Sequence, residues 1–367
     1  MNSNINRVVQ VDISLTMPPA DAASFDHLLI LGPPPAEPLG PIPKVAVYSD
    51  LLEVSGAGYV TTGEKADPVG AAARIAFSQT PRPSRIFVAN YKPPAKYNPS
   101  SPEPGLEDAL NNALQTEGWY MLCPAGLGKG YYHQIAKWTE AQTKMFGYTF
   151  MGKTDPVPGI YMRSHGWCGL VHDDDTPLSA PADNRYAHIA AAAKSLAYPA
   201  GSESWNLQLI SGITPAELSS TLMTSLQEGS SNLITRFARR IRTLNGATRG
   251  GEWIDTIRFR DWLQNDLQLR ILEVLTSAPK LSYTDNEIAL IHSALKAGLK
   301  NAQDRGGVAP SEYDGQGNYI PGFTTRVPSA ASLTAAQRHS RRLEDVTFSA
   351  RLAGAIHFVH IRGALRP

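Results

Sequence analysis

Long hydrophobic runs, cysteine and charge are all scarce in this chain of 367 residues. No stretch approaches the roughly 18 consecutive apolar residues that a membrane-spanning helix needs. The N-terminus also lacks the basic-then-apolar pattern of a signal peptide, so we expect neither membrane insertion nor secretion through a membrane. The two cysteines, Cys123 and Cys168, lie in apolar surroundings. This favours buried free thiols in a reducing compartment over a disulfide framework.

Charge is low in amount and nearly balanced in sign. Charged residues make up 18% of the chain and the net charge is +1, whereas a typical soluble protein has about a quarter of charged residues. A general nucleic-acid binder shows a basic balance, so this composition argues against nucleic acid as a partner. The scarcity of charge suits a protein whose surface is largely buried in an assembly.

Motifs for catalysis and for cofactors are absent as well. The segment 126–130, Gly-Leu-Gly-Lys-Gly, has neither the spacing nor the following Ser or Thr of a phosphate-binding loop. His172 and the three aspartates at 173–175 could ligate a divalent cation, but acidic residues in such a loop are mostly solvated and turn-forming. No metal-ligand spacing and no nucleophile elbow occurs elsewhere. We expect no cofactor, no metal and no enzymatic activity; the alternative, an α/β enzyme for a small molecule, needs a polar pocket.

Both ends of the chain read as β-strands. Near the N-terminus, alternate positions are apolar, at Ile5, Val9, Val11, Ile13 and Leu15. Near the C-terminus, residues 346–367 bend at Gly354 and carry Val346, Phe348, Leu352, Ile356, Phe358, Val359 and Ile361. Segments this apolar are an aggregation hazard when left unpaired. They must pair either inside one molecule or with another copy of the chain.

The first half between these ends alternates strands with helices. Strands are expected over 25–31, 44–47, 84–89, 118–124 and 166–171. Helices are expected over 67–79, 106–116 and 131–146, and from a cap at Asp183 to about residue 198. This spacing predicts an α/β layer over roughly 22–200.

The second half is different in character. A capping box at Thr214–Glu217 predicts a helix to about Gln227, and a second box at Thr284–Glu287 predicts one to about Arg305. The apolar spacing over 253–275 predicts a long amphipathic helix between them. Asn245-Gly246 is typical of a hairpin turn after the mixed apolar and basic segment 232–244.

Arginines are concentrated in this second half. They stand at Arg236, Arg239, Arg240, Arg242 and Arg249, followed by Arg258 and Arg260. A solvated hairpin face and a basic surface for an acidic protein partner explain them about equally well. Nucleic acid is a distant third, because little aromatic interleaving accompanies them.

Several segments resemble one family. They are 251–263 and 283–288, the closing 345–363, and in the first half 89–95, 104–110 and 138–142. Together they are similar to the tail sheath proteins of contractile, myovirus-type bacteriophages, over nearly the whole chain. The closing segment is the most specific of them.

The resemblance implies a fold of mixed α/β and α+β character, in which an outward α/β domain is inserted into a C-terminal α+β sheath core. It further implies that extended N- and C-terminal β-arms are exchanged between subunits. The implied divisions are an N-terminal arm at 1–21, the outer domain at 22–200, the inner core at 201–345, and a last core strand with the C-terminal arm at 346–367.

It also implies a structural role in a virion that is assembled in the host cytoplasm. Many copies would polymerise helically around a tail tube, with baseplate and tail terminator proteins as further partners, and contract to drive the tube through the cell envelope. A tailocin-type injection particle is the alternative. Because sheath must grip the tube and then release it, charge pairs suit that contact better than apolar burial. Arg239, Arg240, Arg242 and Arg249 are the candidates for it.

Overall fold

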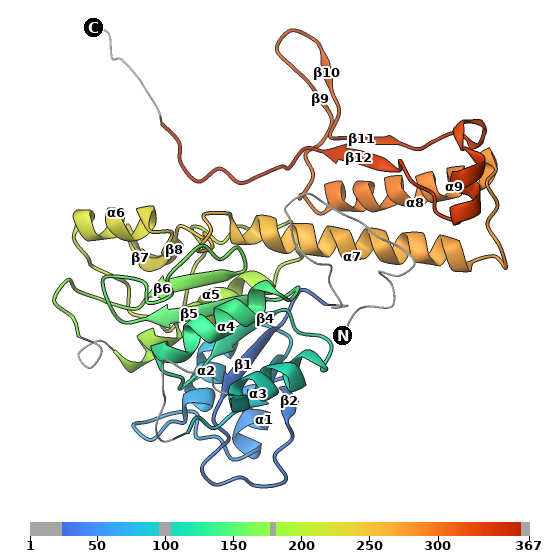
Figure 1. Cartoon of the computed structure of the whole chain (residues 1–367). Coiled ribbons are helices and arrows are strands. Elements are labelled where there is room, and N and C mark those ends of the chain that lie inside the picture. Colours follow the sequence, from blue (N-terminus) through green and yellow to red (C-terminus); the bar gives the residue numbers. More distant parts are fainter. Residues whose placement is uncertain (1–23, 95–103, 177–180, 361–367) are drawn as a thin grey trace, which may run out of the picture.

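The computed structural model describes residues 24–94, 104–176 and 181–360. Its largest sheet has six strands in the order β2-β3-β1-β4-β5-β6 (Figure 1). All neighbours are parallel except β2 and β3. The strands are β1 (Leu28–Gly32), β2 (Val45–Tyr48), β3 (Ile86–Asn90), β4 (Met121–Pro124), β5 (Met145–Phe150) and β6 (Ser164–Cys168).

Helices cover both faces of this sheet, as parallel strands require. They are α1 (Leu51–Gly56), α2 (Pro68–Phe77), α3 (Pro104–Leu114), α4 (Tyr132–Glu140) and α5 (Ala187–Leu196). Successive side chains of β1 alternate between two clusters. Leu28 and Ile30 belong to the one that includes α2 and α5, and Leu29 and Leu31 to the one that includes α3 and α4. The near-continuous apolar sequence of β1 therefore reflects burial on both faces.

The second half adds helices and small two-stranded sheets. Its helices are α6 (Ser220–Glu228), α7 (Ile254–Thr276), α8 (Asp285–Asp304) and α9 (Ala335–Ser340). Its strands are β7 (Leu233–Phe237), β8 (Arg240–Leu244), β9 (Glu312–Tyr313), β10 (Tyr319–Ile320), β11 (Phe323–Arg326) and β12 (Thr347–Ala350). The pairs are β7 with β8, β9 with β10, and β11 with β12. The chain therefore has the mixed α/β and α+β character expected from its sequence.

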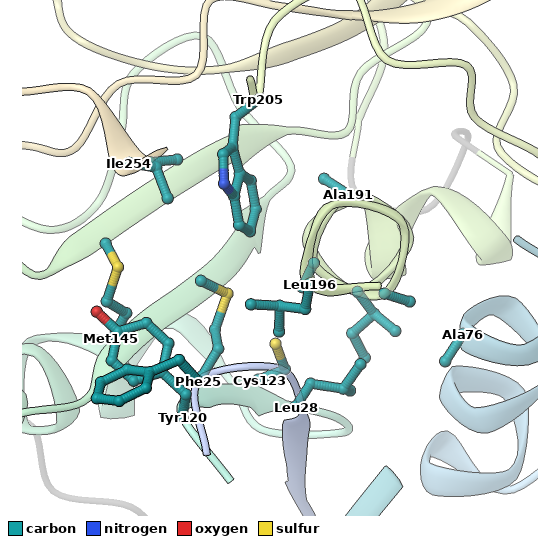
Figure 2. Close-up of a cluster of buried hydrophobic side chains, with 14 of the residues drawn as sticks. Phe25, Leu28, Ala76, Tyr120, Cys123, Met145, Ala191, Leu196, Trp205 and Ile254 are labelled. Atoms are coloured by element: carbon teal, nitrogen blue, oxygen red, sulfur yellow. The ribbon is translucent and has the colours of Figure 1, made fainter. Parts of the chain in front are cut away.

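Helix α7 joins the two halves into one core. Its apolar residues from Ile254 to Leu267 lie in the same buried cluster as α2, α5 and Leu299 of α8. In Figure 2, Ile254 lies beside Trp205, with Phe25, Leu28 and α5 on the other side of the cluster. Figure 1 shows α7 running from the six-stranded sheet to the layer of α8 and the β11–β12 sheet. The core is thus continuous across residue 200, where the predicted boundary lies.

The expected helix over 131–146 is wrong beyond Glu140, where α4 ends. Residues 145–150 form β5 instead, with all six residues buried. The sequence Met-Phe-Gly-Tyr-Thr-Phe is rich in aromatic residues that fit a pleated surface. Pairing with β4 and β6 on its two sides decides the conformation.

Two expected helix starts are also wrong. Residues Thr214–Glu217 are extended, because the Ala216 amide donates to the Ile234 carbonyl at 2.7 Å. Helix α6 begins later, with Ser219 as its cap. Asp183 caps no helix: it lies in the short 3-10 helix Ala182–Tyr186 that precedes α5, and it accepts from Arg74 at 2.6 Å.

The expected turn of the arginine hairpin is displaced as well. Strands β7 and β8 are joined at Ala238 and Arg239, where Ala238 has φ of 54°. Asn245 and Gly246 lie after β8 with φ of 84° and 112°. Their left-handed conformation turns the chain toward α7 and does not close the hairpin.

Candidate subunit-linking and tube-binding surfaces

The C-terminal segment leaves the body along β12. Among the described residues β12 pairs only with β11, in an antiparallel register from Phe323 opposite Ala350 to Arg326 opposite Thr347. Three further backbone hydrogen bonds hold the chain just beyond β12, of which one runs from the Arg351 amide to the Gly322 carbonyl at 2.8 Å. The Ala309 amide donates to the Arg351 carbonyl at 2.8 Å, and the Ala353 amide donates to the Gly307 carbonyl at 3.0 Å.

Beyond Ala353 the apolar side chains of this segment lie in the open. Ile356 is 83% exposed, Phe358 is 81% exposed and Val359 is 66% exposed. No regular strand is formed over 351–360. Full exposure of a Phe or an Ile forgoes roughly 1.5–3 kcal/mol of burial each. These three apolar side chains of the arm are therefore uncovered. Ile361 and the N-terminal positions Ile5, Val9, Val11, Ile13 and Leu15 lie outside the described residues.

The β11–β12 sheet is the surface nearest to the root of the arm. One face packs on the core through Phe323, Phe348 and Ala350, and β11 lies against α8. Within the described ranges both outer edges of this sheet lack a strand partner. Open edges of this kind accept an added strand from another chain through main-chain hydrogen bonds.

The arginine hairpin of β7 and β8 forms a basic surface near the start of α7, away from the β11–β12 sheet (Figure 1). Arg236, Arg239 and Arg240 are exposed, and Arg242 is half-buried. Arg242 folds back and donates to the Leu207 carbonyl at 2.5 Å. Three guanidinium groups are thus displayed around the tip of β7 and β8.

Arg249 lies apart from that tip. Its side chain is 14% exposed and lies 3.6 Å from Asp155, and it donates to the Gly229 carbonyl. Asp155 in turn accepts from the Tyr148 hydroxyl at 2.6 Å. Arg249 therefore links three segments of its own subunit.

Arg258 and Arg260 are buried inside the core. The Arg258 guanidinium contacts Glu203 at 2.6 Å and Asp26 at 2.8 Å. It also donates to the carbonyls of Phe25 and Tyr198. The basic run seen in the sequence is therefore divided into a surface group on the hairpin and a structural group on α7.

Asp261 is the centre of the second buried charge cluster. It accepts two bonds from Arg163, at 2.6 and 3.0 Å, and two from Arg260, at 3.0 and 2.6 Å. The Tyr120 hydroxyl donates to it at 2.7 Å. Burial alone would raise the pKa of the Asp261 carboxyl, but the two arginines outweigh burial and hold that pKa below its usual range.

The acidic loop at His172–Asp175 serves the fold. Asp175 accepts from the backbone amides of Val171 and His172, and Asp173 accepts from that of Ser219. Across 24–94, 104–176 and 181–360, no three His, Cys, Asp or Glu side chains gather as a metal site. A cavity of about 120 Å³ between Leu39, Tyr48 and Tyr59 has no charged residue in its lining. No described helix is long and apolar enough to cross a membrane.

Comparison with solved structures identifies proteins with the same fold. No family model and no curated protein sequence matches the chain. A chain in the baseplate structure of the anti-feeding prophage matches with a TM-score of 0.69 and 13% identity, over 98% of both chains. The contracted helical sheath of the same particle matches with a TM-score of 0.69 and 12% identity, over 97% of this chain and 98% of that one. The chain has the contractile-sheath fold.

A third structure shares the sheath fold. It is a sheath tail protein from Desulfitobacterium hafniense, with a TM-score of 0.51 and 10% identity over 87% of this chain and 93% of that one. These three structures are of sheath and baseplate proteins, not of enzymes. The likeness extends over both halves of the chain, in agreement with the resemblance seen in the sequence.

One contact of the C-terminal arm could not be seen in the sequence. His357 packs against Trp253 and lies 2.9 Å from Ser204. The three residues are far apart in the sequence and follow no motif.

Proposed function

We propose that this chain is the structural subunit of a contractile sheath, which polymerises helically around a tail tube and shortens to drive the tube through a cell envelope. The observation that carries the proposal is the set of uncovered apolar side chains Ile356, Phe358 and Val359 on a chain with the sheath fold. A lone folded subunit gains nothing from such a segment. A neighbouring subunit that covers it gains the burial energy.

The arms are proposed as the links of this assembly. A strand from one neighbour would add to each open edge of the β11–β12 sheet, and the C-terminal arm of this subunit would do the same elsewhere. Ile5, Val9, Val11, Ile13 and Leu15 would line the N-terminal link. Ile356, Phe358, Val359 and Ile361 would line the C-terminal link. The α/β part at 22–200 would then be an outward domain inserted into the core of 201–345.

Truncation tests these links directly. We expect the full chain to form hollow cylinders in negative-stain microscopy. Deletion of 1–16, or truncation after Ala353, should leave a soluble subunit with an unchanged circular dichroism spectrum that forms none. Cylinders from either shortened chain would refute the linking role of that arm. Unfolding of the shortened subunit would favour pairing inside one molecule.

The arginine hairpin is proposed as the surface that faces the tube. Charge pairs across a wet interface are oriented and salt-sensitive, so they can hold a register and still release. Arg239, Arg240 and Arg242 supply the charge at the tip, and Arg249 braces the loop behind it. The partner would be an acidic surface of the tube protein.

Charge reversal at the tip separates tube binding from self-assembly. The double variant Arg239→Glu and Arg240→Glu should lose co-sedimentation with assembled tube at low salt, while cylinders of sheath alone still form. The control reverses two exposed arginines far from the hairpin, Arg82→Glu and Arg342→Glu. Equal tube binding by both double variants would refute this role of the hairpin.

The proposal covers a phage tail and a tailocin-type injection particle alike. Both place the subunit in a particle that is assembled in the cytoplasm of the producing cell, with baseplate and terminator proteins at the ends of the sheath. Contraction would use free energy stored in the extended lattice, without nucleotide hydrolysis. Neighbouring genes for a capsid and a packaging enzyme would mark the phage; their absence beside tube and baseplate genes would mark the injection particle.

A further inference from the structure

The C-terminal arm touches its own subunit once more after it leaves β12. The ring of His357 stands edge-on to that of Trp253, with ring centroids 4.5 Å apart and planes at 88°. The His357 Nε2 atom lies 2.9 Å from the Ser204 hydroxyl oxygen. Between this contact and Ala353, the arm passes Gly354, which has φ of 66° and open space around it. Gly354 allows the sharp bend that brings His357 back to the body.

The surface that receives His357 is rigidly held. Trp253 immediately precedes α7, and the amide of Ile254 beside it donates to the Gly246 carbonyl at 3.0 Å. Ser204 lies between Glu203, whose carboxylate binds buried Arg258, and Trp205, which is 1% exposed. Trp253 and Ser204 are therefore fixed by the core before the arm arrives.

His357 and the two residues beside it on the arm point in different directions. In an extended segment, adjacent side chains point in opposite directions. His357 turns toward Trp253, whereas Ile356 and Phe358 on either side of it are exposed. Over residues 356–358, the imidazole thus contacts its own subunit and the apolar side chains on either side of it face outward.

We infer that Trp253 and Ser204 form a dock for His357 of the same chain, which fixes where and in which direction the C-terminal arm leaves its subunit. The inference rests on the proposed linking role of the arm. Because the segment up to His357 is ordered before a neighbour binds, its ordering cost does not reduce the affinity of the link. Trp253, Ser204 and His357 are positioning residues for subunit exchange.

A distance measurement on the unassembled full-length chain tests the dock. Spin labels are attached at Ala355→Cys and Glu228→Cys, both exposed. The native thiols are buried and do not compete for the label. We expect a narrow distance distribution in the parent, a broad one in His357→Ala and in Trp253→Ala, and a narrow one in the control His339→Ala on α9.

Assembly provides the second readout. We expect His357→Ala to need a roughly tenfold higher protein concentration for half-maximal cylinder formation, as when a link must become ordered only on binding. Trp253→Phe keeps a ring for the edge-on contact and should assemble like the parent. Thermal unfolding of His357→Ala should match that of the parent, because the exposed arm carries little of the fold.

The outcomes separate the dock from the proposed function. A distance distribution that stays narrow in both alanine variants overturns the dock. Broad distributions with unchanged assembly show that the contact exists without positioning the link, which also overturns the inference. Failure of the parent chain to form cylinders counts against the sheath proposal, while its distance distribution still reports whether the arm is docked.

Discussion

The buried Asp261 cluster makes a quantitative prediction about stability. Asp261→Asn keeps the shape of the side chain but removes the charge that neutralises Arg163 and Arg260, whose side chains are 0% and 6% exposed. The side-chain amide of Asn has only one oxygen, so it cannot accept all the hydrogen bonds that reach the two carboxylate oxygens of Asp261. Its NH₂ group is a donor and would face the guanidinium groups, which are donors as well. Breaking a buried ion pair from one side costs about 3–5 kcal/mol, because an uncompensated charge remains in the core. We expect a loss of that size in the free energy of unfolding.

A second Asp→Asn change on the same helix supplies the control. Asp266 pairs with Arg270 at 2.5 Å near the surface of α7, where their side chains are 17% and 35% exposed. Its replacement by Asn should cost about 1 kcal/mol or less. Urea unfolding of the unassembled chain, followed by tryptophan fluorescence, compares the two midpoints. Equal shifts for Asp261→Asn and Asp266→Asn would refute the reasoning, since they would mean that burial adds nothing to the cost.

Two further predictions concern pH. Burial lowers the pKa of His165 and of His188 to about 3 in the folded chain. In the unfolded chain the same imidazoles have a pKa of about 6.5 and take up protons below it. The free energy of unfolding should therefore fall between pH 6.5 and 4.5 by about 2–3 kcal/mol per histidine. A urea midpoint that stays constant over this range would contradict the buried, neutral state. Burial, with Glu203 nearby, raises the pKa of Asp255 to about 6, so its ionised form destabilises the fold above that pH. Asp255→Asn should raise the urea midpoint at pH 7.5, by an amount equivalent to about 3 kcal/mol, and most of the gain should be lost near pH 4. A gain that is equal at both pH values would point to packing instead.

The elements that could be predicted from the sequence are those whose signal is local. Helix α7 follows from apolar residues at helical spacing, and α8 from its cap at Thr284, whose hydroxyl oxygen accepts from the Glu287 amide. Both start within one residue of the expected position. The apolar character of the C-terminal segment could also be predicted, but of the strand expected there only Thr347–Ala350 is formed among the described residues.

The elements that could not be predicted are decided by distant partners. Residues Thr214–Glu217 have the pattern of a capping box, yet Ala216 bonds to Ile234 and the segment stays extended. Arg258 and Arg239 look alike in the sequence, but only Arg258 has Glu203 and Asp26 within reach. The sequence of a run of arginines does not show which of the side chains are exposed. Whether an arginine is buried depends on where the fold places acidic partners for it.

Helix α7 has a mechanical consequence that follows from its length. Its 23 residues span about 34 Å at 1.5 Å per residue. Arg258 and Asp261 fasten its first half to the α/β body, and its far half carries α8 and the β11–β12 sheet. Tilting such a lever by about 10° moves its far end by about 6 Å, which exceeds the roughly 4.8 Å between neighbouring strands. A subunit that tilted by this angle as one rigid piece would therefore carry its arm-bearing sheet past a full strand width, and its arm would have to keep the link to a neighbour through that movement.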